Sequence, residues 1–303
     1  MNSNEKILIN KENLIRGNIL TFEFEPNEYV YNPSRPFRIN NYKYILARVE
    51  NHISNESRIY PYILENGIWR RLNWQLSDLE LEDPAITIID NQILMTAVRA
   101  LDKSNPKNWK IKTVFYYGDD IFSFKEIAEG PLYIKDIRLV KIDRKRIGIL
   151  SRPIYYKDGK KIKRVSYLEI ESLDDLKKIN LNEGTIIQLP ILEDEWVGTN
   201  DICLLNNGLL GVLGHIGSKD KKGNLHYYAI SFILNPDNLT VSNFKIIATR
   251  DNFPAGLSKG RKYKDVIFPG GIEFIETNPS KVNLYCGLSD ANIGMINIDN
   301  PYL

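Results

Sequence analysis

Five polar residues recur along the chain, each beside a segment with the composition of a β-strand: Asn32, Asp83, Asp136, Asp201 and Asp265. After a turn, a second strand-like segment follows each of them and ends at Arg48, Arg99, Arg152, His215 and the Ser289-Asp290 pair. Carboxylates bind sugar hydroxyls well because each oxygen accepts more than one hydrogen bond. Two arginines can clamp a tetrahedral oxyanion through charge-assisted hydrogen bonds.

In an antiparallel hairpin the start of one strand lies beside the end of its partner. Each repeat therefore brings two polar side chains to the same end of its sheet. A repeated strand-turn-strand unit of this spacing is typical of a β-propeller. The sequence predicts an all-β, five-bladed β-propeller that forms one domain over residues 1–303, with blades at 27–80, 81–132, 133–194, 195–260 and 261–303.

A ring of blades has to close. We expect either the N-terminal segment Ile19–Phe24 or the C-terminal segment Gly294–Ile298 to supply a strand to the blade at the opposite end of the chain. Such a strand removes a free sheet edge.

Composition narrows the range of functions. A net charge of +2 gives no electrostatic reason to expect nucleic acid or an anionic membrane as a partner. No stretch approaches the roughly 18 apolar residues needed to cross a bilayer. Cys203 and Cys286 read as reduced thiols, and without a recognisable signal peptide this favours a cytoplasmic protein. With three histidines and no close cysteine pairs, a metal site is not expected. A homo-oligomer remains possible.

Several motifs resemble glycoside hydrolase family 130, whose members are five-bladed propellers that act on β-mannosides with phosphate or water. These motifs include Arg48-Val-Glu, Leu81-Glu-Asp-Pro-Ala-Ile-Thr, Lys264-Asp-Val-Ile-Phe-Pro-Gly-Gly and Leu284-Tyr-Cys-Gly-Leu-Ser-Asp. Other segments are more similar to a bacterial group of related propellers long described as a domain of unknown function. They read Glu195-Trp-Val-Gly-Thr-Asn-Asp, Gly211-Val-Leu-Gly-His-Ile-Gly and Ala248-Thr-Arg-Asp-Asn-Phe-Pro.

The resemblance implies a cytoplasmic enzyme that cleaves a terminal β-mannoside or a similar β-glycoside of a short oligosaccharide with inversion. Asp83 would be the general acid, acting through a sugar hydroxyl. The nucleophile would be inorganic phosphate, held by Arg138, Arg152 and His215, or water activated by Asp201 or Asp265. The remaining sugar contacts would come from Asn32, Arg48, Asp136 and Asp290, with Trp196 stacked on a sugar face. No cofactor is implied beyond phosphate as a possible co-substrate.

Two departures from the family pattern keep alternatives open. Family phosphorylases usually carry a lysine near the segment that here reads Gly198-Thr-Asn-Asp, and an arginine where Ala85 stands. The changes favour water over phosphate, or a propeller that binds sugar without cleaving it. Structural roles also compete: the aspartates could cap strands, the arginines could pair with neighbouring blades, and Trp196 could pack between blades.

Overall fold

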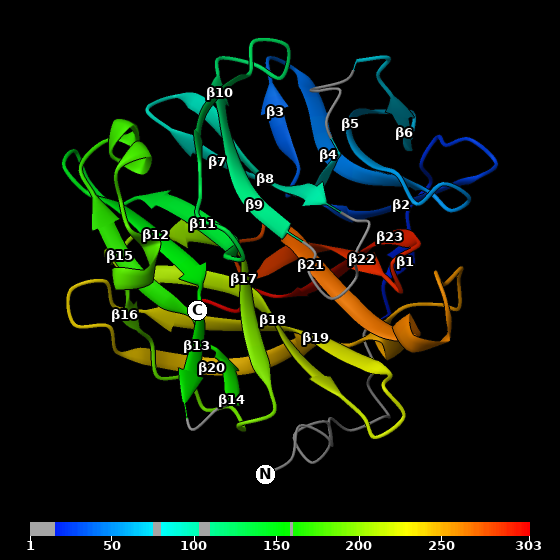
Figure 1. The fold of residues 1–303 in the computed structure, drawn as a ribbon. Coiled ribbons are helices and arrows are strands. Elements are labelled where there is room, and N and C mark those ends of the chain that lie inside the picture. The colour runs from blue at the N-terminus through cyan, green and yellow to red at the C-terminus, as the bar shows by residue number, and fades with distance from the viewer. Residues whose placement is uncertain (1–15, 75–79, 103–109, 158–159) are drawn as a thin grey trace.

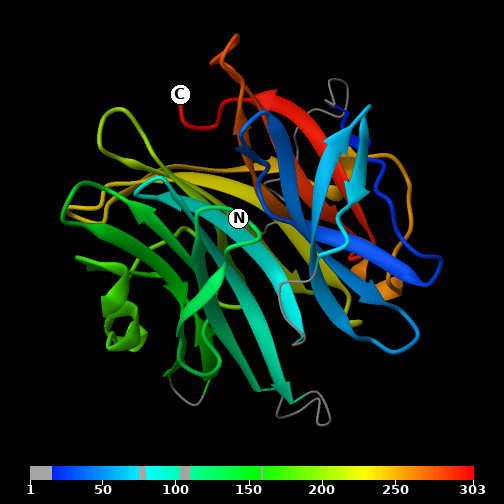
Figure 2. The ribbon, with the colours of Figure 1, turned by 90° about the horizontal axis from the view of Figure 1, so that it is seen from above.

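Five blades of mainly antiparallel strands follow one another in chain order around a central region, from blue through green to red in Figure 1. The computed structural model describes residues 16–74, 80–102, 110–157 and 160–303. The predicted all-β five-bladed propeller is confirmed, and the described strands from Glu28 onward fall within the predicted blade ranges. A short parallel pairing of His226 and Tyr227 with Asp265 and Val266 joins blades four and five into one sheet. The first sheet lies beside the last one in both views (Figures 1 and 2).

The strands of the first two blades alternate with short turns. Blade one contains β2 (Glu28–Pro33), β3 (Phe37–Ile39), β4 (Tyr42–Asn51), β5 (Ser57–Glu65) and β6 (Ile68–Arg71). Blade two contains β7 (Leu81–Ile89), β8 (Gln92–Asp102), β9 (Lys110–Gly118) and β10 (Lys125–Glu129). In blade two the strands pair in chain order. In blade one β2 and β3 both pair with β4, and β5 and β6 then follow in chain order, so each blade is a meander.

The remaining blades repeat this plan. Blade three contains β11 (Lys135–Lys141), β12 (Ile147–Arg152), β15 (Ser166–Ile170) and β16 (Thr185–Ile186), with a separate hairpin of β13 (Ile154–Lys157) and β14 (Lys160–Lys163). Blade four contains β17 (Trp196–Leu204), β18 (Leu210–Lys219), β19 (Leu225–Leu234) and β20 (Val241–Ala248). Blade five contains β21 (Asp265–Phe274), β22 (Lys281–Leu288) and β23 (Asn292–Asp299).

Helical structure in the described residues is limited to single turns of 3-10 helix. They are η2 (Leu173–Lys177), η3 (Leu181–Glu183), η4 (Arg250–Asn252) and η5 (Arg261–Tyr263). Within the described ranges, no helix has the length and apolar character that crossing a membrane requires.

The core is divided among the interfaces between neighbouring blades. One apolar cluster joins blades three and four, for example Leu150 with Val212, and another joins blades one and two, for example Leu46 with Met95. Similar clusters lie at the other interfaces. Because the middle strands are covered on both faces, they read as nearly continuous apolar runs, as in the Leu210–Ile216 segment of β18. The first strands β2, β7, β11, β17 and β21 pack against one another at the centre.

The N-terminal segment closes the ring, as predicted. Asn18–Ile19 forms β1, which pairs antiparallel with Gly294–Met295 of β23 in blade five. Just beyond it, the backbone of Thr21 and Glu23 exchanges hydrogen bonds with Trp69 of blade one, each at 2.9 Å. The same segment therefore ties the last blade to the first.

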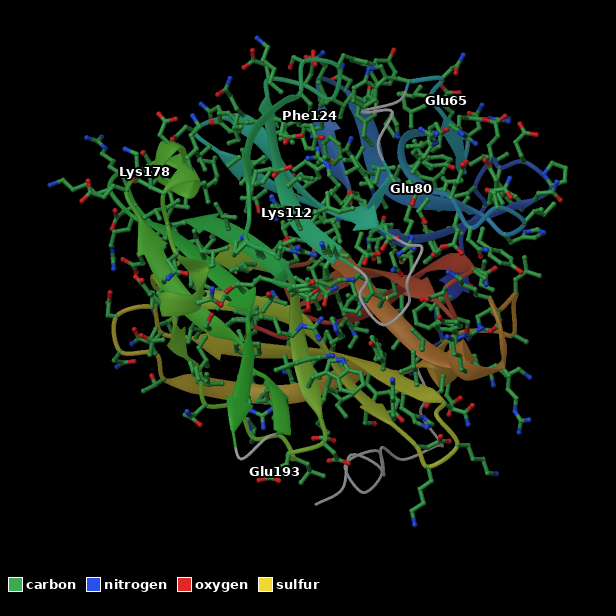
Figure 3. All side chains as sticks on the ribbon, viewed as in Figure 1. Glu65, Glu80, Lys112, Phe124, Lys178 and Glu193 are labelled. Atoms are coloured by element: carbon green, nitrogen blue, oxygen red, sulfur yellow. The ribbon has the colours of Figure 1, made fainter. Side chains whose placement is uncertain are left out.

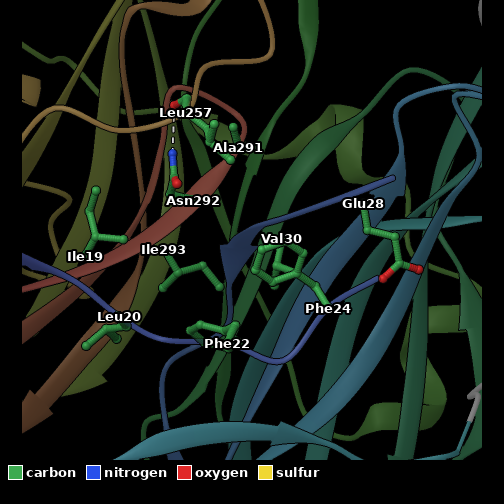
Figure 4. Close-up of a pocket in the computed structure, with 10 residues that line it drawn as sticks. All are labelled: Ile19, Leu20, Phe22, Phe24, Glu28, Val30, Leu257, Ala291, Asn292 and Ile293. Atoms are coloured by element: carbon green, nitrogen blue, oxygen red, sulfur yellow. Dashed lines mark hydrogen bonds between the residues drawn. The ribbon is translucent and has the colours of Figure 1, made fainter. Parts of the chain in front are cut away.

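Phe22 anchors this closing segment. Its ring lies 5.0 Å edge-on from Tyr62 and is stacked 5.7 Å from Trp69, and only 7% of the residue is exposed. Phe22 and Phe24 both line a pocket between the closing segment and β23 (Figure 4), but Phe24 is 51% exposed.

We therefore expect Phe22→Ala to lower the free energy of unfolding by about 3–5 kcal/mol, the usual loss for deleting a buried phenyl ring. Urea denaturation monitored by tryptophan fluorescence would measure the loss. Phe24→Ala is the matched control and should change stability by about 0.5 kcal/mol or less. Equal losses for both variants would contradict an anchoring role for Phe22.

Candidate functional site

The first strand of each blade contains a β-bulge, where one extra residue shifts the register with the neighbouring strand. The register shifts at Tyr31/Pro33, Glu82/Ala85, Lys135/Arg138, Thr199/Asp201 and Pro269/Gly271. Asn32, Asp83 and Asp136 lie in the first three bulges with φ of 45°, 52° and 56°. Asn and Asp tolerate this left-handed conformation better than other residues with side chains. The bulge thus explains why polar residues recur at these positions.

The first cluster joins blades one and two. Asp83 accepts hydrogen bonds from Asn32 Nδ2 at 2.8 Å and from Arg48 Nη1 at 3.3 Å. Arg48 Nη2 also lies 2.9 Å from Glu50 Oε2 and 3.0 Å from Glu82 Oε1. One buried guanidinium therefore serves three carboxylates. The structure brings together the predicted residues Asn32, Arg48 and Asp83.

Two aspartates of this cluster have pKa values displaced in opposite directions. Burial acts to raise the pKa of Asp83, but Arg48, Lys135 and the hydrogen bond from Asn32 outweigh it and hold that pKa below its usual range. Asp290 follows β22 in blade five and is only partly exposed. Burial, together with the negative charges of Asp83 and Glu50, raises the pKa of Asp290 to about 6, against the opposing charges of Arg48 and Lys259.

The second cluster joins blades three and four. Arg152 Nε lies 2.7 Å from Asp136 Oδ2, and His215 Nδ1 lies 2.8 Å from Asn200 Oδ1. Gly198 separates Asp136 from His215 without a side chain of its own. A Cβ at that position would lie 2.2 Å from Asp136 Oδ2 and 2.4 Å from His215 Cε1. The glycine is therefore required for the carboxylate and the imidazole to approach each other.

The two clusters lie close enough to influence each other electrostatically, and the strands that carry Asp83, Asp136 and Asn200 pack together at the centre of the ring. The charges of Asp136 and Arg152 affect the pKa of His215, and so does the charge of Asp83 from the first cluster. Tyr227, stacked on His215 at 5.1 Å with an angle of 2°, has a pKa raised to about 12. Burial is the main cause, and the charges that act on it include Arg152 and Asp290, one from each cluster. We give the name central funnel to the group of residues that comprises Asn32, Arg48, Asp83, Asp136, Arg152, His215 and Asp290.

Three other predicted residues lie in different settings. Arg138 is buried, and its guanidinium donates to the carbonyl oxygens of Asn200 and Ile137 and to Thr96. Asp201 accepts hydrogen bonds from the backbone N–H groups of Ile202 and Ile272 and lies 3.7 Å from Arg35.

Asp265 is not the counterpart of the other bulge residues. It is the first residue of β21, where it accepts hydrogen bonds from His226 and Tyr228. The bulge position of blade five is Gly270, where a Cβ would lie 2.1 Å from the carbonyl oxygen of Pro33, so no side chain fits there. Arg99, which also belongs to the sequence repeat, does not join either cluster, because it binds Glu126 and Glu129 of its own blade.

Trp196 lies at the start of β17 and contacts Tyr227 edge-on at 5.7 Å, while Gly217 lies against its ring. Tyr227 itself was not predicted, and neither were Glu50, Lys259 and Asn200. Lys259 lies in the loop before blade five and reaches Glu50 of blade one at 2.5 Å. Only Glu50 left a sequence signal, because it lies two residues beyond Arg48 in the quoted Arg-Val-Glu motif.

Charged side chains also cover the outer rim, as Glu65, Lys178 and Glu193 show in Figure 3, but there they are solvated. The buried acids and arginines of the central funnel are different, because uncompensated burial of charge is costly. The described residues contain no group of three or more His, Cys, Asp or Glu side chains suited to hold a metal ion. The arrangement can bind polar hydroxyl groups beside Asp83 and an anion or water beside Arg152 and His215.

Comparison with known proteins adds independent information. Three solved structures share the fold over 96% of this chain. A mannose phosphorylase from Leishmania mexicana, in complex with phosphate ion, is 24% identical with a TM-score of 0.84 and is covered over 90% of its length. A GDP-Man-dependent mannosyltransferase from the same organism is 28% identical with a TM-score of 0.82 and 91% coverage. A hypothetical protein from Leishmania major is 26% identical with a TM-score of 0.82 and 92% coverage.

Curated proteins give no match. The sequence model of one family, described as a protein of unknown function (DUF1861), matches residues 7–303. The predicted resemblance to phosphorylase-type propellers and to a group without a known function is thus confirmed. Because the match extends over nearly the whole sequence, the chain belongs to the DUF1861 family.

Proposed function

We propose that this protein is a carbohydrate-active enzyme that cleaves a terminal β-mannoside, or a similar β-glycoside, of a short oligosaccharide with inversion. One observation carries the proposal: the carboxyl group of Asp83 in blade two and the polar pair Arg152 and His215 of blades three and four belong to the same central funnel. Asp83 contacts Asn32 and Arg48, whereas Arg152 contacts Asp136 and His215 contacts Asn200. An inverting enzyme needs an acid and a nucleophile on opposite faces of the sugar. Similarity to a mannose phosphorylase supports the choice of sugar.

In this proposal Asp83 is the general acid. The free protein holds Asp83 ionised at neutral pH, because its pKa is lowered by Arg48, Lys135 and Asn32 against the effect of burial. The acid step therefore requires a substrate-bound state in which Asp83 has gained a proton. Asp290 is the proposed source, because its pKa is raised to about 6 by burial and, in part, by the charge of Asp83, so that it carries a proton under mildly acidic conditions.

The nucleophile is phosphate or water, and the basic side of the funnel suits either. Arg152 has one nitrogen committed to Asp136. Its remaining N–H groups can donate to a phosphate oxygen, which an arginine fork binds well. Asp201 and Asp265 are the two carboxylates proposed to activate water. Asp201 is the more buried and already accepts two backbone hydrogen bonds. Asp265 already accepts hydrogen bonds from His226 and Tyr228.

A sugar-binding propeller without catalysis is the second candidate. The observations that favour it are Ala85, which stands where the related enzymes have arginine, and the ionised state of Asp83 in the free protein. Incubation with β-1,2-mannobiose and longer manno-oligosaccharides, with and without phosphate, separates the candidates. Mannose 1-phosphate indicates phosphorolysis, mannose indicates hydrolysis, and unchanged sugar with binding heat in calorimetry indicates a binding protein.

Asp83→Asn should lower turnover of the cleaved mannoside by about 10²-fold or more, as expected for loss of a general acid. Product release per minute, followed by chromatography of the released sugar, measures it. Asp174→Asn is the control, because the Asp174 side chain is 86% exposed on η2, and it should leave turnover unchanged. Near-normal turnover of the Asp83→Asn variant would remove Asp83 from the acid role.

Arg152→Met should raise the KM for phosphate by about 10- to 100-fold, because a charge-assisted hydrogen bond contributes about 1.5–3 kcal/mol. Initial rates measured across a phosphate series at saturating sugar give that constant. Arg70→Met, at a side chain 47% exposed on blade one, should leave the phosphate KM as it is. If the wild-type rate does not depend on phosphate at all, water is the nucleophile and the phosphate role of Arg152 is lost.

Asp290→Asn should change stability in a pH-dependent way. The folded pKa of about 6 lies above the unfolded value of about 3.9. The wild type therefore loses stability as the pH rises from about 4 through 6, and the variant does not. Relative to the wild type, the variant should gain about 2–3 kcal/mol between pH 4 and pH 8. Urea unfolding at the two pH values measures this gain, which Asp174→Asn should not show. A pH-independent difference would contradict the raised pKa.

A further inference from the structure

Asn200 is the extra residue in the bulge of β17, where its carbonyl and its side-chain Oδ1 have partners and its buried Nδ2 has none among the described residues. Only 1% of the residue is exposed. Its backbone carbonyl accepts a hydrogen bond from Arg138 Nε at 2.7 Å, and its side-chain Oδ1 lies 2.8 Å from His215 Nδ1. Arg138 in turn contacts Thr96 of blade two. Asn200 thus connects the His215 ring to a framework that spans three blades.

The ring of His215 is equally constrained. It is stacked on Tyr227 at 5.1 Å and lies 5.0 Å from Phe268 at an angle of 39°, while Gly198 leaves its Cε1 edge open. With 1% of the residue exposed, the imidazole is enclosed by these neighbours. Its Nδ1 edge faces Asn200, and its Nε2 edge faces the side of Gly198 and Asp136. Among the described residues, no hydrogen-bond partner occupies Nε2.

The charges around the ring do not make it an imidazolium. Burial is the largest influence and lowers the pKa of His215 to about 4. Asp136 and Asp83 oppose this shift, whereas Arg152 and Arg138 reinforce it. Asp136 is already paired with Arg152 at 2.7 Å, so its charge is largely compensated. A neutral ring carries one proton, and the nitrogen that carries it is set by the partner of the other.

We infer that Asn200 is a positioning residue that keeps the proton of neutral His215 on Nδ1, so that Nε2 presents a hydrogen-bond acceptor to the central funnel. An amide Oδ1 can only accept, which selects the Nδ1–H form. The bare Nε2 then accepts a hydrogen bond from an oxygen that still carries hydrogen. The inference rests on the proposed function for the identity of that oxygen, which is water or the protonated oxygen of hydrogen phosphate. No proton transfer to the ring is required.

The state of the ring can be measured without any substrate. Long-range ¹H–¹⁵N correlation spectra of protein labelled with ¹⁵N-histidine distinguish a proton-bearing nitrogen from a bare one, and the chain has three histidines to resolve. His215→Gln identifies the signal. We expect Nδ1–H and a bare Nε2 from pH 5 to pH 8. A proton on Nε2, or on both nitrogens at pH 7, would overturn the inference.

Two variants then test Asn200. Asn200→Leu removes the acceptor, so the ring should move to the Nε2–H form and kcat/KM should fall by about 10²-fold, the scale of a misplaced reacting group. Asn200→Asp keeps an acceptor and adds a negative charge. Its ring should retain Nδ1–H, its pKa should rise, and activity at acid pH should fall at a higher pH than in the wild type. Asn206→Asp, an identical change in an exposed turn of blade four, is the control.

These outcomes distinguish a failure of the positioning role of Asn200 from a failure of the proposed enzymatic function. If the Asn200→Leu variant is folded by circular dichroism and keeps both the wild-type tautomer and rate, Asn200 has no positioning role. If the Asn200→Leu variant does not fold, the pKa of His215 in the Asn200→Asp variant decides alone. An unchanged pKa would count against the inference. If the wild-type ring has the predicted tautomer but no glycoside is cleaved, the proposed function fails while the assignment of the ring stands.

Discussion

A single inserted residue in the first strand of each blade is the constraint on which the central funnel depends. The bulge interrupts the alternation of side chains along the strand and re-aims one of them. At Asn32, Asp83 and Asp136 it does so through a left-handed backbone, which costs on the order of 1–3 kcal/mol per residue. In blade five the same position is Gly270, because the backbone of blade one occupies the space. The propeller is therefore symmetric in its backbone plan but not in the groups it presents.

Buried charge in the funnel is balanced within blades, as by Arg48 with Glu50 and Arg152 with Asp136, and polar contacts between blades add to this. Asn32 of blade one contacts Asp83 of blade two, and Thr199 of blade four donates to the carbonyl of Asp136 in blade three. Lys259, from the loop before blade five, pairs with Glu50 of blade one. Each contact holds a funnel residue in place and also joins two blades. The groups that could bind substrate are thus preorganised by the interactions that satisfy their own burial.

Repeat spacing in the sequence was enough to predict the five blades, the ring closure and most funnel residues, because a blade needs the same strand order and the same turn every time. The prediction from spacing failed where the position of a bulge decides which residue of a strand points to a given face. A shift of one position moves a side chain to the other face of a sheet. Asp201 seemed equivalent to Asp83, but the bulge residue is Asn200. Arg99 fits the repeat, yet Glu126 and Glu129 hold it within blade two. The ion pair of Lys259 with Glu50 joins distant parts of the chain, so no local sequence pattern predicts it.

The pairing of Asn18–Ile19 with Gly294–Met295 has a consequence for biosynthesis. These strands are separated by almost the entire polypeptide, so a nascent chain on the ribosome can assemble successive blades but cannot complete the circle. The cluster around Phe22 and Ile293 stays open to water until synthesis has passed β23. Final closure is accordingly a late step with a large loop-entropy cost. An incompletely made chain would leave β1 unpaired, and chaperones protect exposed strand edges of this kind.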